Sequence, residues 1–298
     1  MTEKSCMVGL DSLLSAWAER VEADLAQWTV EPDTPVELAE VMRYCVLGGG
    51  KRLRPGLVYL TAETLGGDLS AEPVRRSAVA VELVHGYSLV HDDLPSMDDD
   101  TLRRGHPTAH VKFGEAMAVL AGDALLTRAF AVLGEMDSPA AGRLVAELAR
   151  AAGCAGMVAG QVADMMLCDV PRGCEGLRYI HLRKTAALMR AAARMGAICA
   201  DGEPAQLQAV DRYAENLGLA FQLIDDLLDV TGSAEDLGKI PGKDQAAGKR
   251  THVAEMGLDR TRRLGAELTR EAIESLLPLG QRANPLVRLA ELLAERTR

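Results

Sequence analysis

Residues 83–100 read LVHGYSLVHDDLPSMDDD, a mostly apolar run followed by five carboxylates within nine positions. The apolar run carries few charges over several turns, which predicts a helix buried on most sides. Pro95 predicts that this helix ends within about one residue of Leu94, because the residue before a proline disfavours the α conformation. Asp92 and Asp93 would then lie on the last helical turn, and Asp98 in the loop beyond. Since the helix dipole disfavours negative charge at a carboxyl end, the arrangement predicts a bound cation.

The rest of the chain also gives signals for helix. Of its 298 residues, 48% are hydrophobic but only 3% are aromatic, and no segment sustains an apolar and polar alternation that would indicate a sheet. Ala, Leu, Met, Glu and Arg recur at three- and four-residue spacing in about ten segments. These lie near residues 10–28, 35–47, 55–66, 71–93, 114–135, 139–168, 175–200, 204–230, 255–277 and 285–297. Only short turns separate them, so we expect one all-α domain over residues 1–298.

A second acidic motif, FQLIDDLLD at residues 221–229, lies at the end of another apolar segment. Asp225 and Asp229 are four residues apart and share one helix face, with Asp226 one position round. Carboxylates this close repel one another unless divalent cations lie between them. Oxygen ligands without His or Cys nearby in sequence indicate Mg²⁺, which substrate phosphates often complete. The two motifs therefore predict two walls of one metal site.

Basic residues accompany the acidic motifs. Residues 48–55 read GGGKRLRP, a glycine turn that leads into a helix with three cations. Backbone N–H groups at a helix N-terminus, together with Lys and Arg side chains, form an anion site. The segment does not match a Walker A loop. Further cations lie close in sequence to the acidic motifs: Arg103, Arg104, Lys184, Lys239 and Lys249. A metal together with these cations predicts a phosphate-bearing ligand.

Charge and composition exclude several other classes of protein. The net charge of −10 argues against a general nucleic-acid-binding protein, which needs a basic face. The longest stretch without Asp, Glu, Lys or Arg runs from Ala151 to Ala163, too short to span a bilayer. The N-terminus lacks the pattern of a secretory signal, so we expect a cytoplasmic protein. The six cysteines form no C-x-x-C pair, which argues against a zinc site and a disulfide scaffold.

Five motifs in order carry a resemblance to a known family. They are GGGKRLRP, HGYSLVHDDLPSMDDDTLRRGHPT, RKTAALMRAAARMGA, FQLIDDLLDV and LGKIPGKDQAAGK. Together they resemble the trans-isoprenyl diphosphate synthases, and most of all the bacterial short-chain farnesyl diphosphate synthases. The resemblance covers roughly residues 35–290. It implies an isoprenoid synthase fold of ten or more helices around a central cavity, a homodimer and three Mg²⁺ ions.

The resemblance also implies a reaction. It is the Mg²⁺-dependent head-to-tail (1'-4) condensation of isopentenyl diphosphate with dimethylallyl or geranyl diphosphate. The products expected are (2E,6E)-farnesyl diphosphate and diphosphate, as in isoprenoid biosynthesis. An apolar pocket that excludes water suits such carbocation chemistry, because metals and fixed charges can stabilise the leaving diphosphate.

Carried over position by position, the resemblance assigns roles to individual residues. Metal ligands would come from both DDxxD-like motifs: Asp92, Asp93, Asp98, Asp225, Asp226 and Asp229. Cations on the allylic diphosphate would be Arg103, Lys184, Lys239 and Lys249. The isopentenyl diphosphate pocket would contain Lys51, Arg54, His85 and Arg104. Thr185 and Gln222 would lie beside the reacting carbon and steady its positive charge.

In this family the fifth residue before the first motif limits product length. Here it is Tyr87, with Ser88 next to it, and the bulky ring favours a C15 product over C20. Geranylgeranyl diphosphate synthase and a catalytically silent partner subunit remain alternatives. A terpene cyclase is disfavoured by the DDLLD motif and the low aromatic content. The chain departs from the family pattern at Thr101, His106, Arg250, His252 and Val253.

Overall fold

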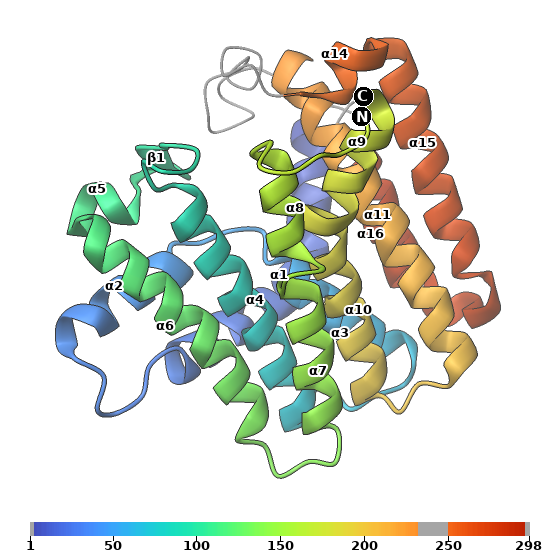
Figure 1. The fold of residues 1–298 in the computed structure, drawn as a ribbon. Coiled ribbons are helices and arrows are strands. Elements are labelled where there is room, and N and C mark those ends of the chain that lie inside the picture. The colour runs from blue at the N-terminus through green and yellow to red at the C-terminus, as the bar shows by residue number, and fades with distance from the viewer. Residues whose placement is uncertain (1–2, 232–249, 296–298) are drawn as a thin grey trace.

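The computed structural model describes residues 3–231 and 250–295, and within them it is almost entirely helical (Figure 1). The long elements are α1 Glu3–Trp28, α2 Val36–Leu47, α3 Leu53–Thr64, α4 Glu72–Asp92, α6 Glu115–Gly134, α7 Ala141–Ala152, α10 Ala187–Cys199, α11 Pro204–Thr231, α15 Leu258–Ser275 and α16 Asn284–Glu295. The short elements are α5 Ala109–Phe113, α8 Met157–Asp164, α9 Gly173–His181, the π-turn η1 Leu182–Ala186, α14 His252–Met256 and the 3₁₀ segment η2 Leu277–Ala283. The predicted all-α class is confirmed.

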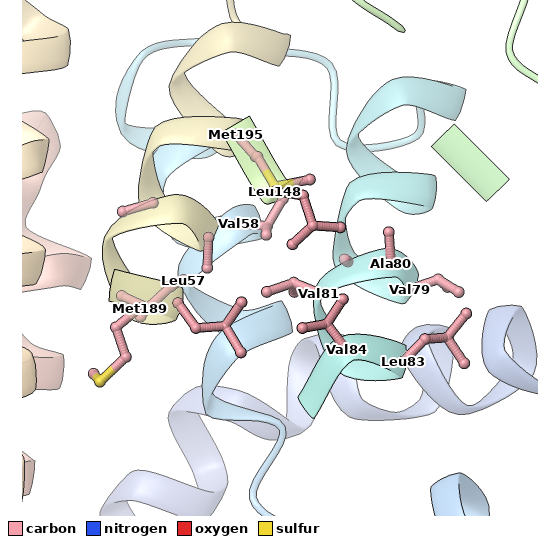
Figure 2. Packing of buried hydrophobic residues seen from close by; sticks show 14 of the residues in the cluster. Leu57, Val58, Val79, Ala80, Val81, Leu83, Val84, Leu148, Met189 and Met195 are labelled. Carbon is pink, nitrogen blue, oxygen red and sulfur yellow. The ribbon is translucent and has the colours of Figure 1, made fainter. Parts of the chain in front are cut away.

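The helices α3, α4 and α10 form the centre of the bundle. In Figure 2, Leu57 and Val58 of α3 lie between Val81 and Val84 of α4 and the methionines of α10. These side chains are at most 2% exposed, as expected for helices that are apolar on most sides. Around this centre, α6 lies against α4, and α15 lies against α11 (Figure 1).

Two predicted helices are each divided in the structure. The segment near 139–168 forms α7 and α8, because Gly153 and Gly156 leave the helical conformation between them. A Cβ on Gly156 would lie 2.0 Å from the Ala151 carbonyl oxygen, so only glycine fits this turn. The segment near 175–200 forms α9, η1 and α10. A π-turn inside a helix often marks a functional site, and this one carries Lys184 and Thr185.

A short hairpin, which the sequence did not predict, follows the first acidic motif. Its strands are β1 Leu102–Arg103 and β2 His106–Pro107, paired antiparallel. The turn residues Arg104 and Gly105 both have positive φ, at 53° and 79°, as a two-residue type I′ turn requires. The hairpin lies at the same end of the bundle as the carboxyl ends of α4 and α11 (Figure 1).

Helix α6 is long and apolar enough, by length and composition alone, to cross a membrane. Asp123 and Arg128 interrupt its apolar sequence, and Arg128 pairs with Glu31 and Glu135 at 2.8 and 2.7 Å. The opposite face packs on α4 with Ala121 and other buried residues. One face of α6 is thus packed on the bundle, as in a helix of a folded protein.

Candidate active site

The first acidic motif is folded back on the end of α4 by backbone hydrogen bonds. The N–H of Asp98 donates to the carbonyl of Asp92 at 2.9 Å, and the N–H of Asp100 donates to that of Asp93 at 3.2 Å. Carbonyls that would be left unpaired at the helix end are thereby satisfied. The sequence predicted that Asp98 lies in the loop beyond the helix; the structure adds that this loop brings Asp98 back to Asp92.

Charge is concentrated around Asp92. Burial raises the pKa of its carboxyl to about 6, the nearby Asp98 and Asp93 raise it as well, and Lys184 and Arg103 act in the opposite direction. A carboxylate with this environment is costly to ionise, and a divalent cation would relieve the cost. The influence of Lys184 also shows that the π-turn lies within electrostatic range of the first acidic motif.

Asp93 has a different environment from Asp92, although it is the next residue. It is 3% exposed, and Arg103 of β1 donates to both of its oxygens from Nε, at 2.8 and 2.9 Å. Arg103 also lies 3.6 Å from Asp100. The ion pair ties the hairpin to the end of α4. Two residues assigned from the sequence to the metal and to the allylic diphosphate are thus paired with each other.

The four residues assigned to isopentenyl diphosphate line one cavity of about 550 Å³. Its walls come from α3, α4, α11 and α16. The predicted group consists of Lys51, Arg54, His85 and Arg104.

Electrostatics indicate that this cavity is suited to an anion. Burial lowers the pKa of Arg54, and Arg104 lowers it too. The Nε of Arg54 is buried without a hydrogen-bond partner among the described residues. His85 has a pKa well below its usual value, because of burial and then of Arg54 and Arg104, which makes its ring neutral at pH 7. Crowded cations and an unsatisfied donor are what a bound diphosphate would relieve.

The glycine turn and the hairpin meet at this cavity. The guanidinium of Arg104 donates to the carbonyl of Gly49 and lies against Gly50, where a Cβ would come within 2.6 Å of its Nη1. Arg52, between Lys51 and Arg54 in the chain, also lines the cavity, but its guanidinium is already paired: it is 4% exposed and contacts Glu22 of α1 and Glu82 of α4.

The π-turn supplies two further predicted residues. Thr185 donates to the side-chain oxygen of Gln222 on α11 at 3.1 Å. Lys184 Nζ lies 2.7 Å from Asp164 of α8, a residue that the sequence analysis missed. The approach is close because of Gly160, where a Cβ would lie 2.3 Å from the Lys184 nitrogen. The signal that could have found Asp164 is its place one helical turn after Gly160, at the end of a run without charged residues.

The second acidic motif also separates into different environments. Asp225 is half-buried and close enough to raise the pKa of Arg54, against the effect of burial. Asp226 and Asp229 are 4% and 3% exposed. Asp226 Oδ2 accepts the backbone N–H of His252 at 2.9 Å and lies 3.3 Å from its ring Nδ1. The predicted cations Lys239 and Lys249 lie outside the described residues.

Tyr87 is held in place by its neighbours. Its ring meets that of His91 edge to face, with centroids 5.6 Å apart. His91 in turn lies 3.1 Å from the Val119 carbonyl oxygen and fits over Gly122 of α6, where a Cβ would lie 2.1 Å from its Nε2. Ser88 donates to the carbonyl of His85 at 2.8 Å, so it points along its own helix.

The carboxylates of the two motifs suit Mg²⁺ by their chemistry. Their oxygens are hard ligands, and the pKa of Asp92 is raised to about 6 by burial first and by the neighbouring carboxylates as well. Among residues 3–231 and 250–295, no three His, Cys, Asp or Glu side chains form a ready-made metal cluster.

Known proteins resemble this chain along most of its length. The profile of one family, described as polyprenyl synthetase, matches residues 35–276. Farnesyl diphosphate synthase of Escherichia coli K12 is 46% identical over 275 residues, covering 89% of this chain and 91% of that protein. Geranylgeranyl pyrophosphate synthase 11 of Arabidopsis thaliana, chloroplastic, is 46% identical over 286 residues, or 93% and 79% of the two chains.

A solved structure shows the same arrangement of helices. The apo crystal structure of an FPP/GFPP synthase from Zymomonas mobilis superimposes with a TM-score of 0.83 at 36% identity. It covers 95% of this chain and 98% of its own.

Proposed function

The chain belongs to the polyprenyl synthetase family and is a prenyltransferase, and we propose that it makes (2E,6E)-farnesyl diphosphate and diphosphate from isopentenyl diphosphate and dimethylallyl or geranyl diphosphate. The membership confirms the resemblance drawn from the five motifs. One observation carries the proposal of two diphosphate substrates: a cavity with crowded cations lies close to two acidic motifs.

In this proposal the cavity holds isopentenyl diphosphate. Lys51, Arg54 and Arg104 bind its diphosphate, and the neutral ring of His85 adds a hydrogen bond. Phe221 and Leu293 line the same cavity and would pack against the apolar part of the substrate. An anion in this place would pair the buried Nε of Arg54.

The allylic diphosphate would lie between the two acidic motifs. Asp92, Asp98 and Asp225 would hold the magnesium ions, of which the family resemblance implies three. Magnesium there would supply positive charge that neutralises the leaving diphosphate. Lys184 would bind the same diphosphate, since it already lies within electrostatic range of Asp92.

The reaction then needs three changes in bonding. The allylic C–O bond breaks, and its electron pair leaves with the diphosphate. The double bond of isopentenyl diphosphate attacks the allylic cation and forms the new C–C bond. A proton is lost from the adduct to the departing diphosphate. The oxygens of Thr185 and Gln222, which are hydrogen-bonded to each other, would steady the cation by their fixed dipoles.

Tyr87 supports the C15 product. Its ring contacts His91, which packs closely against Gly122 of α6. We therefore propose that the Tyr87 ring cannot move aside and blocks further growth of the prenyl chain. A C20 product is the second candidate, because relatives of equal identity are named geranylgeranyl synthases. The silent partner subunit is disfavoured, because both acidic motifs are intact.

The proposal extends to the whole chain acting as one domain in a homodimer. Val119 and Leu120 of α6 and Val158 and Val162 of α8 are exposed, although they are large and apolar. A second copy covering such a face would remove it from water. The cytoplasmic location stays a prediction.

A product assay tests the proposed function. Purified protein would receive Mg²⁺, isopentenyl diphosphate and either allylic primer, and the dephosphorylated products would be sized by chromatography. We expect C15 from the wild type, nothing with EDTA, C15 from Tyr87→Phe and longer products from Tyr87→Ala. A C20 product from the wild type would keep the enzyme class and overturn the role of Tyr87. Absence of any metal-dependent condensation would favour the silent subunit.

A further inference from the structure

His252 is one of the positions where the chain departs from the family pattern, and it contacts the second acidic motif directly. Its backbone N–H donates to Asp226 Oδ2 at 2.9 Å, and its ring Nδ1 lies 3.3 Å from the same oxygen. Both residues are only 4% exposed. Water therefore does not compete for this carboxylate oxygen, and the two contacts fix the direction of the Asp226 side chain.

We propose that His252 is a positioning residue that orients the second acidic motif, and that Asp226 serves as its anchor. This inference rests on the proposed function, since it concerns the diphosphate site assigned there. Asp225 and Asp226 are adjacent on α11, so their side chains point about 100° apart around the helix. Holding Asp226 inward against α14 keeps Asp225 on the side of Arg54 and the cavity.

The ring of His252 has a second neighbour on the other wall of the site. It lies 5.0 Å, centroid to centroid, from the ring of His181. His181 is the last residue of α9 and stands three residues before Lys184 in the π-turn. Burial lowers the pKa of His181 to about 4, which makes it a neutral partner at pH 7. His252 therefore contacts Asp226, next to Asp225 on α11, and also His181, which precedes the π-turn of Lys184.

The segment around His252 is itself held by other contacts. Thr251 accepts the N–H of Ala254 at 3.2 Å and begins α14. Arg250 donates to the Gly173 carbonyl at 3.3 Å, at the start of α9. Both residues that precede His252 therefore fix its backbone, so its N–H is aimed at Asp226 before any ligand binds. A group fixed in this way suits a positioning role, because supporting contacts commonly set the orientation of ligating side chains.

Two variants separate the hydrogen bond from the packing. His252→Asn keeps an N–H donor near the place of Nδ1 but loses the ring contact with His181. His252→Phe keeps the ring and loses the donor. The backbone N–H remains in both variants. If the proposal is right, the His252→Asn variant still supports Asp226 and binds pyrophosphate as the wild type does, whereas His252→Phe binds it more weakly. A role in packing alone predicts the opposite order.

The experiment measures binding of inorganic pyrophosphate by calorimetry on the full chain at saturating Mg²⁺, followed by a Mg²⁺ titration at fixed pyrophosphate. We expect His252→Phe to weaken pyrophosphate binding about tenfold, as loss of a supporting partner does. His252→Asn should stay within about threefold of the wild type on the same principle. The effect of His252→Phe should vanish in an Asp226→Asn background, because the contact is then already altered.

The outcomes distinguish this inference from the proposed function. Equal binding by wild type and His252→Phe, or additive effects in the double variant, would overturn the positioning role and leave the prenyltransferase proposal standing. Binding lost in the Asn variant but kept in the Phe variant would also overturn it, in favour of packing. A wild type that binds no pyrophosphate with Mg²⁺ would instead contradict the proposed diphosphate site.

Discussion

The two acidic motifs are similar in sequence but are held in the fold by different means. In each, the first aspartate of an Asp-Asp pair is half-buried and the second is buried and paired. Asp93 is held by the charged fork of Arg103 from a hairpin ten residues further on. Asp226 is held by a backbone N–H and a neighbouring imidazole from a helix twenty-six residues further on.

The difference between the two anchors has consequences that can be measured. A bidentate ion pair with a buried carboxylate depends strongly on both partners, since removal of one leaves an unpaired charge. The second anchor combines a backbone N–H, which a side-chain variant at His252 keeps, with the imidazole ring, which such a variant alters, so Asp226 would lose part of its support but not its partner. We therefore expect variants at the first anchor to act mainly on stability and variants at the second to act mainly on ligand binding.

The largest effect is expected at the first aspartate of the first motif. Asp92→Ala should lower kcat/KM for the prenyl condensation by about 10²–10³-fold, because it removes a carboxylate proposed to hold the magnesium that neutralises the leaving diphosphate. Steady-state assays with both substrates measure it. Asp99→Asn is the matched control, since Asp99 is exposed and its φ of 50° is one that asparagine tolerates. Equal losses in the two variants would refute the distinction between Asp92 and its neighbours.

The next largest effect is expected at the ion pair between Arg103 and Asp93, which anchors the first acidic motif. Arg103→Met should lower the free energy of unfolding by about 3 kcal/mol, because it leaves the carboxylate of Asp93 buried and unpaired. Urea unfolding measures the change. Arg262→Met is the control: its pair with Asp259 is exposed and 3.8 Å long, so a change below about 0.5 kcal/mol is expected. A small effect of Arg103→Met would show that Asp93 is satisfied without this ion pair.

The smallest expected effect depends on pH. Because the pKa of Asp92 is raised to about 6, the folded protein binds its proton more tightly than the unfolded chain does. The metal-free wild type therefore loses stability as pH rises from about 4 to about 6, and Asp92→Asn escapes that loss. The free energy of unfolding of Asp92→Asn minus that of the wild type is measured in EDTA at pH 4 and at pH 7. This difference should be larger at pH 7 by roughly 1–3 kcal/mol. A difference that does not change with pH would contradict the charged environment of Asp92.

The sequence predicted the helical segments well where apolar spacing is regular and turns are marked. The end of α4 at Asp92 followed from Pro95, whereas the return of Asp98 to the helix end depends on backbone hydrogen bonds that no pattern in the sequence indicated. The sequence did not predict that the helical segment 139–168 is divided into α7 and α8. Gly153 and Gly156 do not interrupt the apolar spacing there and end the helix only through their backbone conformation. The π-turn was missed for a similar reason: one extra residue in a helical turn leaves the apolar pattern almost unchanged.

The sequence by itself determined the all-α class and the family, and it singled out the two acidic motifs and the basic turn, because periodicity, motif order and residue chemistry are local properties. Only the tertiary structure decided how those charges are divided. It left the Nε of Arg54 without a partner in the cavity and paired the neighbouring Arg52 with Glu82, and it paired Asp93 with Arg103 and Asp226 with His252. Adjacent residues of one helix or turn point in different directions, and their partners come from segments distant along the chain, so no local pattern could assign them.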